Sequence, residues 1–410
     1  MANATYTRPQ TGTADTRVRF LPFVRVTGRP QPQATVGEDA ITMFLAGFAL
    51  FALFLDGWRH NNTIGIDTFW ALPHTLMYSG LGALGVWLTI VLWRYQKSLS
   101  ELDWSAVPHG YGLAFVALPL AMLAGNADFQ WHASFGFENQ IDSTYSPPHQ
   151  MLFLAGTLLG SIPAASAWQR RGVALSLGTL LPALISVSSI VVMTIFVIHQ
   201  STPFYGVPAM TPAFQQDIAG RADAYAPGSE AIHIEGLSPA LIHYGDEAFP
   251  YYFYSTHHTV NGLLLTSFML LGGVLVMRRR WQLPFGAMTI MFTWMAWQFP
   301  ILSAGREWTL APSLVLAGLV GDVLLASLVG TRGPMRIGRI RVFSALLPVV
   351  IWGLFLLCVA MLGDGLAWGA TLWTGILTTS AAFGYALSFL VFPPGHGTAV
   401  EQVPAAAVAD

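Results

Sequence analysis

The feature that most constrains this chain is a series of long apolar blocks, each close to the length that an α-helix needs to cross a ~30 Å hydrocarbon core. The blocks lie at 40–57, 72–94, 110–127, 148–168, 173–198, 252–277, 284–304, 309–331, 342–363 and 366–392. Only 10% of the 410 residues are charged, which is too few to cover a water-soluble surface. The sequence therefore predicts an all-α, polytopic integral membrane protein with about ten transmembrane helices. It excludes a soluble enzyme and a nucleic-acid binder.

Basic residues predict the orientation of these helices, because Arg and Lys in short loops stay on the cytoplasmic side of a membrane. If the helices alternate in direction, one face carries Arg94, Lys97, Arg170, Arg171, Arg278 to Arg280, Arg332, Arg336, Arg339 and Arg341. The arginine-rich N-terminal arm lies on the same face. We therefore expect a multi-pass protein of the plasma membrane with both termini in the cytoplasm.

Polar and apolar segments also divide the chain into regions. Residues 1–38 are polar and predict a disordered cytoplasmic arm, and residues 393–410, rich in Pro and Ala, predict a cytoplasmic tail. Repeated helical hairpins occupy 39–199, and the remaining transmembrane helices occupy 251–392. The polar segment 200–250 is too short for a separate enzyme domain, so we expect it to cap the external face.

Two segments within the hairpin region repeat one another. The first reads Asp56-Gly-Trp-Arg-His60 and then Asp67-Thr-Phe-Trp-Ala-Leu-Pro-His74; the second reads Asp128-Phe-Gln-Trp-His132 and then Asp142-Ser-Thr-Tyr-Ser-Pro-Pro-His149. In both, Asp and His stand four residues apart, a second Asp precedes a second His by seven, and Pro immediately precedes that last His. Equal spacings at so many positions indicate a duplicated helical hairpin.

Each repeat brings one Asp and two His toward one point. Residues four apart lie on one face of a helix, and the last His stands in the first turn of the next, antiparallel helix, which Pro is well placed to start. Two imidazoles and one carboxylate suit Cu, Zn or Fe. The predicted metal ligands are Asp56, His60 and His74 in the first hairpin and Asp128, His132 and His149 in the second. The alternative is that these groups only cap helix ends.

Other polar residues are candidates for supporting roles. Asp67 and Asp142 are placed to orient an imidazole of each triad. Additional candidate ligands are His199, His257 and His258, at the outer ends of later helices. Asp322 stands alone inside an apolar block, where an acidic residue marks a functional site unless a partner such as Arg or Thr satisfies it.

The second repeat resembles a known motif. The string from Asp128 to His132, with Trp before the His, and the segment from Asp142 to His149 are similar to the copper-site region of the C subunit of the particulate methane and ammonia monooxygenases. The resemblance extends over about residues 40–170. It implies that Asp128, His132 and His149 correspond to the copper ligands of that family, whose activity also needs partner subunits.

The leading hypothesis is therefore copper-dependent oxidation of a small apolar substrate by O2. A thiolate metal cluster is excluded because Cys358 is the only cysteine. One alternative is a membrane-embedded zinc hydrolase, in which Glu138 or Asp142 serves as the catalytic base. Another is a non-enzymatic protein that handles copper or zinc. The expected partners are the lipid bilayer and either further membrane subunits or a second copy of the chain.

Overall fold

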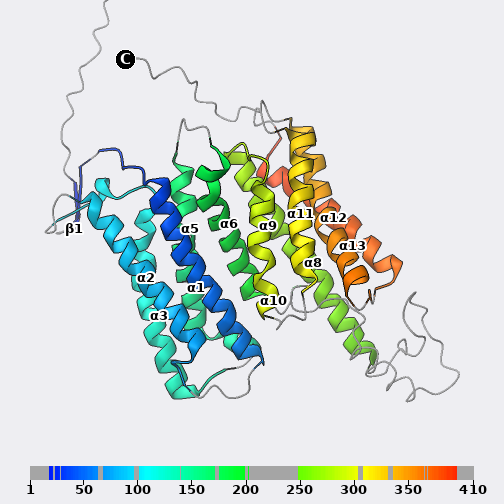
Figure 1. Ribbon diagram of the computed structural model, residues 1–410, viewed down its shortest axis with the longest axis horizontal. Coiled ribbons are helices and arrows are strands. Elements are labelled where there is room, and N and C mark those ends of the chain that lie inside the picture. Colours follow the sequence, from blue (N-terminus) through cyan, green and yellow to red (C-terminus); the bar gives the residue numbers. More distant parts are fainter. Residues whose placement is uncertain are drawn as a thin grey trace, which may run out of the picture.

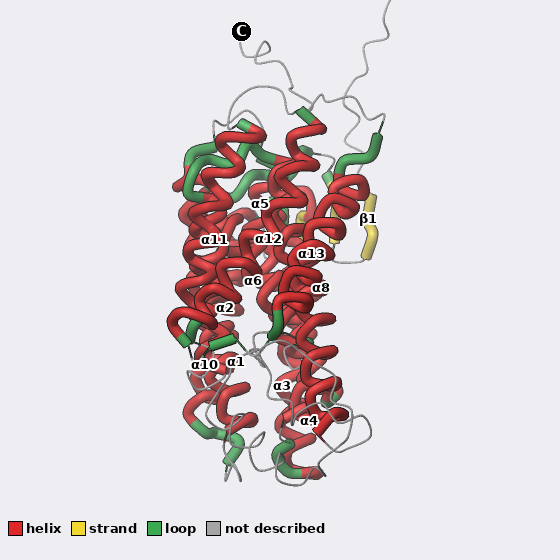
Figure 2. The backbone as a smooth tube through the Cα atoms, turned by 90° about the vertical axis from the view of Figure 1, so that its right-hand side faces the viewer, coloured by secondary structure: helices red, strands yellow, loops and turns green. Residues whose placement is uncertain are grey.

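The computed structural model describes residues 18–21, 24–27, 29–62, 68–96, 101–138, 140–170, 175–198, 202, 248–302, 308–330, 336–363, 365–366 and 368–394. These residues form a bundle of long helices that run side by side (Figure 1, Figure 2). Nine of the described helices are long and apolar enough to cross a membrane. The chain is an all-α, multi-pass membrane protein, which confirms the fold class predicted from the apolar blocks.

Helices form at every predicted apolar block. They are α1 (Val36–Asn62), α2 (Leu72–Tyr95), α3 (Ala114–Phe135), α5 (Pro147–Trp168), α6 (Leu177–Val197), α8 (Ala248–Arg280), α9 (Ala287–Ala296), α10 (Gln298–Leu302), α11 (Leu310–Leu324) with η5 (Leu325–Val329), α12 (Ile337–Leu362) and α13 (Ala370–Val391). The block at 284–304 differs from the others because it forms the short helices α9 and α10 instead of one span.

Asp322, the isolated acidic residue of α11, caps the start of α9. Its carboxylate accepts hydrogen bonds from the backbone N–H groups of Met288 at 3.0 Å and Thr289 at 2.9 Å, and from the Thr289 hydroxyl at 2.7 Å. The first turn of a helix leaves such N–H groups without partners inside the helix. The buried carboxylate of Asp322 is therefore satisfied within the bundle, with Thr289 as its partner.

The prediction of a disordered arm over 1–38 is wrong for the described part of that segment. Strands β1 (Val18–Leu21) and β2 (Val24–Val26) pair antiparallel, and β2 pairs in parallel with β3 (Leu102–Asp103). Arg25 lies 3.6 Å from a carboxylate oxygen of Glu101, and the Thr27 N–H donates to Ser105 Oγ at 3.0 Å. Residues 24–27 are ordered because their partners come from a distant loop, which their own composition does not reveal.

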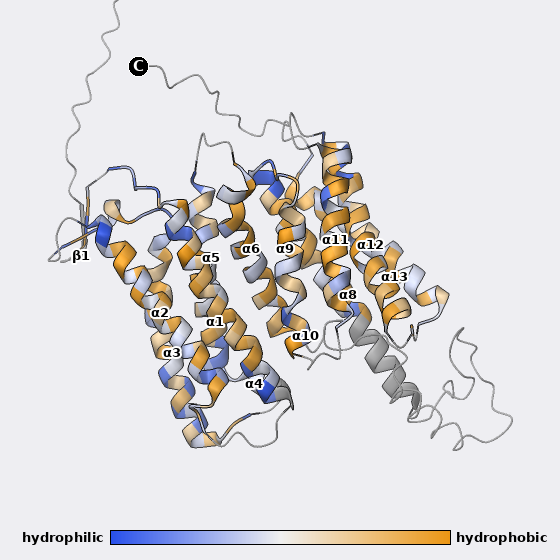
Figure 3. Cartoon of the chain, in the orientation of Figure 1, coloured by the Kyte–Doolittle hydropathy of each residue, from blue (hydrophilic) through white to orange (hydrophobic). Residues whose placement is uncertain are grey.

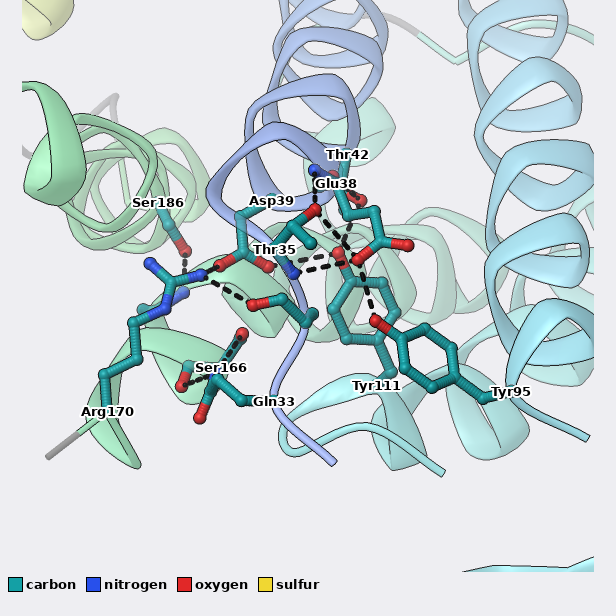
Figure 4. A network of polar contacts seen from close by, with 12 residues as sticks. Gln33, Thr35, Glu38, Asp39, Thr42, Tyr95, Tyr111, Ser166, Arg170 and Ser186 are labelled. Carbon is teal, nitrogen blue, oxygen red and sulfur yellow. Dashed lines mark hydrogen bonds and ion pairs between the residues drawn. The ribbon is translucent and has the colours of Figure 1, made fainter. Parts of the chain in front are cut away.

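A capping box and a polar network hold the start of α1 (Figure 4). The Thr35 N–H donates to Glu38 Oε2 at 2.8 Å, and the Glu38 N–H donates to Thr35 Oγ1 at 3.1 Å. Asp39 is ion-paired with Arg170, which follows α5, and accepts a hydrogen bond from the Tyr111 hydroxyl at 3.1 Å. These contacts fix the position of α1 along α5.

The two repeated hairpins lie next to each other. The first is α1 with α2, and the second is α3 with α5, with α4 (Gln140–Tyr145) in the longer second loop. Because α1 also packs on α5, the hairpins share an interior. Hydrophilic residues gather near α4 and near the opposite, sheet end, with apolar residues between them (Figure 3). The later helices pack around a large apolar core that includes Phe292, Phe343 and Trp352.

Candidate metal centre

Both hairpins present their predicted ligands through the same local structure. An Asp and a His four residues apart lie at the C-terminal end of the first helix of each hairpin. These pairs are Asp56 with His60 in α1 and Asp128 with His132 in α3. His74 and His149 are each the third residue of the following helix, directly after Pro in its first turn. Pro is favoured at that point because its fixed φ suits the helix and its missing N–H costs no helical hydrogen bond.

The structure joins the two predicted triads into one buried cluster. One nitrogen from each of His60, His74, His132 and His149 lies within 4.8 Å of the others, and all four side chains are buried. Two nitrogens that bind one ion at about 2.0–2.1 Å stand at most about 4.2 Å apart. The distances between these four nitrogens therefore exceed those around a single bound ion by only a small margin. The sequence predicts one ion for each triad, whereas the described residues form one centre to which both hairpins contribute.

Asp128 of α3 is completely buried and uses both of its carboxylate oxygens. Oδ1 lies 3.3 Å from His132 Nε2 and 3.1 Å from His149 Nε2. Oδ2 accepts a hydrogen bond of 2.5 Å from the Tyr78 hydroxyl of α2. The carboxylate of the second hairpin is therefore held by a side chain of the first. Burying a carboxylate is costly without a positive charge or a metal ion, and Tyr78 supplies a hydrogen bond but no charge.

Asp56 of α1 occupies the equivalent place in the first hairpin with less support. Its Oδ1 lies 3.3 Å from His74 Nδ1, and its Oδ2 lies 3.6 Å from His60 Nε2. Phe153 of α5 stands where Tyr78 stands in α2, four residues after the second histidine of its hairpin. Phe153 borders the same small cavity as Asp56 but has no hydroxyl to donate. Asp56 Oδ1 accordingly has no hydrogen-bond partner among the described residues.

Backbone carbonyls fix the orientation of three of the four imidazoles. His60 Nδ1 lies 2.7 Å from the carbonyl oxygen of Glu138, and His132 Nδ1 lies 3.1 Å from that of Gly136. His149 Nδ1 bonds in the same way to a carbonyl oxygen of α4. Because a carbonyl oxygen only accepts, each Nδ1 carries the proton and each Nε2 presents a lone pair to the cluster. Metal-binding histidines are commonly held through their other nitrogen in this way.

Several buried atoms of the cluster have no hydrogen-bond partner within the described part of the chain. They are Asp56 Oδ1, His60 Nε2, both ring nitrogens of His74, Asp128 Oδ1 and His132 Nε2. Carboxylate oxygens and imidazole lone pairs that face each other repel unless a proton or a cation lies between them. Nitrogen and oxygen donors of this kind suit Cu(II), Zn(II) or Fe(II). The residues present therefore fit a metal ion.

The two carboxylates predicted to be catalytic lie outside the ring of inward-facing nitrogens. One Glu138 oxygen lies 3.3 Å from His132 Nδ1, the nitrogen that points away from the cluster, and the other accepts a hydrogen bond from Trp131 Nε1. That position suits a carboxylate that orients a metal-bound imidazole. The side chain of Asp142, in α4, is exposed. The structure therefore brings Glu138 to the back of the centre and leaves Asp142 apart from it.

The remaining sequence candidates are not placed in the centre by the described residues. His199, Asp67 and nearly all of 200–250 and 393–410 lie outside those residues, and for His257 and His258 only their position in α8 is described. His109 lies at the sheet end, where its N–H donates to the Pro32 carbonyl at 3.0 Å. The centre described here therefore rests on the two repeated hairpins alone.

Sequence reasoning missed the residues that support the ligands. Ser146, the residue that precedes α5, places its hydroxyl 2.9 Å from His149 Nδ1. The Ser-Pro-Pro-His string could have indicated this contact, because the side chain of a Ser that precedes a helix reaches the third residue of that helix. Tyr78, which donates to Asp128, carries no local signal, because this contact is made only when the chain folds.

The centre thus combines four buried histidines with two buried aspartates, contributed equally by two hairpins. Its donors are nitrogen and oxygen, and three of its imidazoles are held by backbone carbonyls. No family model, curated protein or solved structure matches this chain.

Proposed function

We propose that this chain is a membrane metalloprotein, related to the copper membrane monooxygenases, that binds copper in the four-histidine centre and oxidises a small apolar substrate with O2. The observation that carries the proposal is a set of buried atoms that have no hydrogen-bond partner among the described residues, which includes His60 Nε2, His132 Nε2 and Asp128 Oδ1. Burying such atoms is unfavourable unless a cation binds them. The cluster therefore favours a bound metal over a purely structural role.

The donor set supports copper. The cluster offers imidazole nitrogens and carboxylate oxygens, and the single cysteine, Cys358, lies in α12. For a given set of such donors, Cu(II) binds more tightly than Zn(II), Fe(II) or Mn(II). The four histidines would hold the ion, and the two aspartates would balance its charge. When bound, copper supplies one-electron redox chemistry and a binding position for O2.

The side chains around the ligands orient them and keep water away. Phe69, Phe137 and Phe153 stack on His74, His132 and His149, respectively. The Tyr78 hydroxyl holds one oxygen of Asp128, which leaves the other directed at two histidines. Apolar walls lower the local dielectric, so the attraction between the carboxylates and a cation is stronger than in water.

The proposal places the centre toward the external face and both termini in the cytoplasm. The charged residues at the sheet end support this orientation, because Arg and Lys are retained in the cytoplasm. Arg94 pairs with Glu38 and Arg170 with Asp39 at the start of α1, and Arg280 donates to a carbonyl at the end of α5. His60 lies in the last turn of α1 and His149 in the first turn of α5. These helix ends lie opposite the sheet end of the bundle (Figure 1).

Metal competition tests the proposal. Purified protein offered equal concentrations of copper and zinc should retain copper and give a Cu(II) electron paramagnetic resonance (EPR) signal with imidazole nitrogen couplings. When a small apolar substrate and an external two-electron reductant are supplied, the copper form should consume O2, whereas Asp128→Ala should retain little copper and show only background consumption. Retention of zinc with exclusion of copper would overturn the proposal and favour a zinc hydrolase.

A further inference from the structure

An apolar cavity lies inside the bundle beside the metal centre. It has a volume of about 50 Å³ and lies between α1, α2, α5 and α6. Its walls include Met43, Leu50, Leu81, Leu84, Leu159 and Met193. This volume is several times the ~10–15 Å³ that one water needs. The space, here called the inner cavity, therefore has room for a small molecule.

The inner cavity is unfavourable for a polar molecule, because the hydroxyl groups that line it already form hydrogen bonds. Its two hydroxyl groups belong to Thr157 and Ser189. The Thr157 hydroxyl donates to a carbonyl of its own helix at 2.7 Å, and Ser189 Oγ accepts from Trp294 Nε1 at 3.0 Å. Apolar cavities of this kind stay dry and bind apolar atoms or molecules.

Two side chains separate the inner cavity from the metal centre. Leu53 of α1 and Phe153 of α5 line the inner cavity and also line a smaller cavity of about 20 Å³, the site cavity. The site cavity is bordered by Asp56, His60 and His149. Phe153 stacks on His149 with ring centroids 6.2 Å apart. A rotation of Leu53 or Phe153 would therefore connect the inner cavity to the ligands.

A groove on the outer surface of the bundle borders the inner cavity on another side. Leu81 of α2 lines both spaces, and the groove runs between α2 and α3 with a volume of about 730 Å³. Val86, Met122 and Phe129 are exposed in the groove. Because α2 and α3 are both candidate membrane spans, these apolar side chains face lipid. Leu81 therefore separates the inner cavity from the bilayer.

We infer that the groove, the inner cavity and the site cavity form a lateral route by which small apolar molecules pass from the bilayer to the metal centre. Leu81 is its outer gate, and Leu53 with Phe153 is its inner gate. The molecules that the route would deliver are O2 and an apolar substrate small enough for the inner cavity. Their identity rests on the proposed function. Apolar molecules concentrate in hydrocarbon and not in water, so a lateral opening supplies both reactants while water is kept out.

Filling the inner cavity tests the route. Gly160 of α5 lines this cavity, and a Cβ at that position meets no heavy atom within 4 Å, so the side chain of Gly160→Leu starts in open space and occupies the cavity. Gly353 of α12 has the same free space and does not line the route, so Gly353→Leu is the matched control. The probe is xenon, which binds dry apolar cavities and is followed by xenon NMR on the full chain with and without copper.

The route predicts three results. Xenon should bind the wild type and Gly353→Leu, and its affinity should fall about tenfold or more in Gly160→Leu, which corresponds to about 1.4 kcal/mol. Bound Cu(II) should accelerate the relaxation of xenon in the wild type, because the inner cavity lies beside the centre. Leu81→Trp should slow the exchange of xenon with lipid at unchanged copper content. Equal xenon affinity in Gly160→Leu and the wild type, or no effect of bound copper on relaxation, would overturn the route.

The route and the proposed function fail separately. If the protein takes up no copper but its xenon binding is lost in Gly160→Leu, the result supports the inner cavity and refutes the copper function. If copper binds and xenon does not, the result refutes the route and leaves the copper function supported.

Discussion

The two hairpins carry the same ligand pattern but support it differently. In the second hairpin, Asp128 accepts a hydrogen bond from Tyr78, and the hydroxyl of Ser146 lies 2.9 Å from the last histidine. The ligands of the first hairpin lack both groups: the residue of α5 that corresponds to Tyr78 of α2 is Phe153, the residue before α2 that corresponds to Ser146 is Ala71, and neither side chain carries a donor or an acceptor. A duplicated ligand pattern therefore does not imply two equivalent sites. The ligands of the second hairpin are held by more polar contacts than the ligands of the first.

His74 shows the same difference at a single ligand. Both of its ring nitrogens lack a hydrogen-bond partner among the described residues, whereas the other three histidines are each held by a backbone carbonyl. His74 is positioned instead by Phe69, which stacks on it with ring centroids 5.1 Å apart. Its Nδ1 also lies 3.3 Å from Asp56 Oδ1, but no backbone carbonyl among the described residues fixes which of its nitrogens faces the cluster. The first hairpin is therefore the adaptable side of the centre.

The largest difference between the hairpins should appear when their carboxylates are removed. Asp128→Ala removes contacts to two histidines and leaves the Tyr78 hydroxyl without its acceptor. Copper affinity should therefore fall by more than about 100-fold, the upper range for partners that only orient a ligand. Asp56→Ala should cost less, because Phe153 stands where a tyrosine hydroxyl would donate and the distances from Asp56 to His74 and His60 are longer, at 3.3 and 3.6 Å. Copper titration, with circular dichroism to check folding, measures both; equal losses would contradict unequal support.

A smaller effect is expected from the hydroxyl that links the hairpins. A hydrogen bond to a charged group contributes ~1.5–3 kcal/mol, so Tyr78→Phe should weaken copper binding about 10- to 100-fold. Phe153→Tyr places the corresponding hydroxyl on the Asp56 side, where it should strengthen binding. The two variants are matched, because each changes one hydroxyl at the same position of the repeat. Unchanged copper affinity in Tyr78→Phe would show that Asp128 needs no support from the first hairpin.

The smallest effect should come from the residue before each hairpin's second helix. Ser146→Ala removes a neutral partner of His149 and should weaken copper binding about 2- to 10-fold, as expected for ~0.5–1.5 kcal/mol. Ala71→Ser should bring the first hairpin closer to the second and strengthen binding. Ser146 makes no side-chain capping bond to α5, so the melting temperature without metal should stay the same. A large fall in that temperature would indicate a structural role instead.

The sequence was sufficient to predict the helices and the places of the candidate ligands at their ends. Apolar block length marks the spans, and the four-residue spacing with Pro before the last His places Asp128, His132 and His149 correctly on α3 and α5. These signals are local, because they depend on residues within one helix or one turn. Local sequence did not predict the ordered structure of residues 24–27, because that structure depends on partners near Ser105.

The union of the two triads could not be predicted, because it depends on how α1 packs on α5. That packing is fixed far from the centre by the ion pair of Asp39 with Arg170, residues 131 positions apart. The bond between Tyr78 and Asp128 likewise joins different hairpins. The position of Glu138 behind His132 follows from the course of a loop, and no residue spacing encodes it.

Copper binding to His74→Ala tests most directly whether both hairpins build one centre. If they do, removing this nitrogen from the first hairpin weakens the binding of every copper ion, and no copper remains with the wild-type affinity or the wild-type EPR signal. If the second triad acts alone, His74→Ala retains all or half of its copper with both properties unchanged. The shared centre predicts the first result, and the second would contradict it.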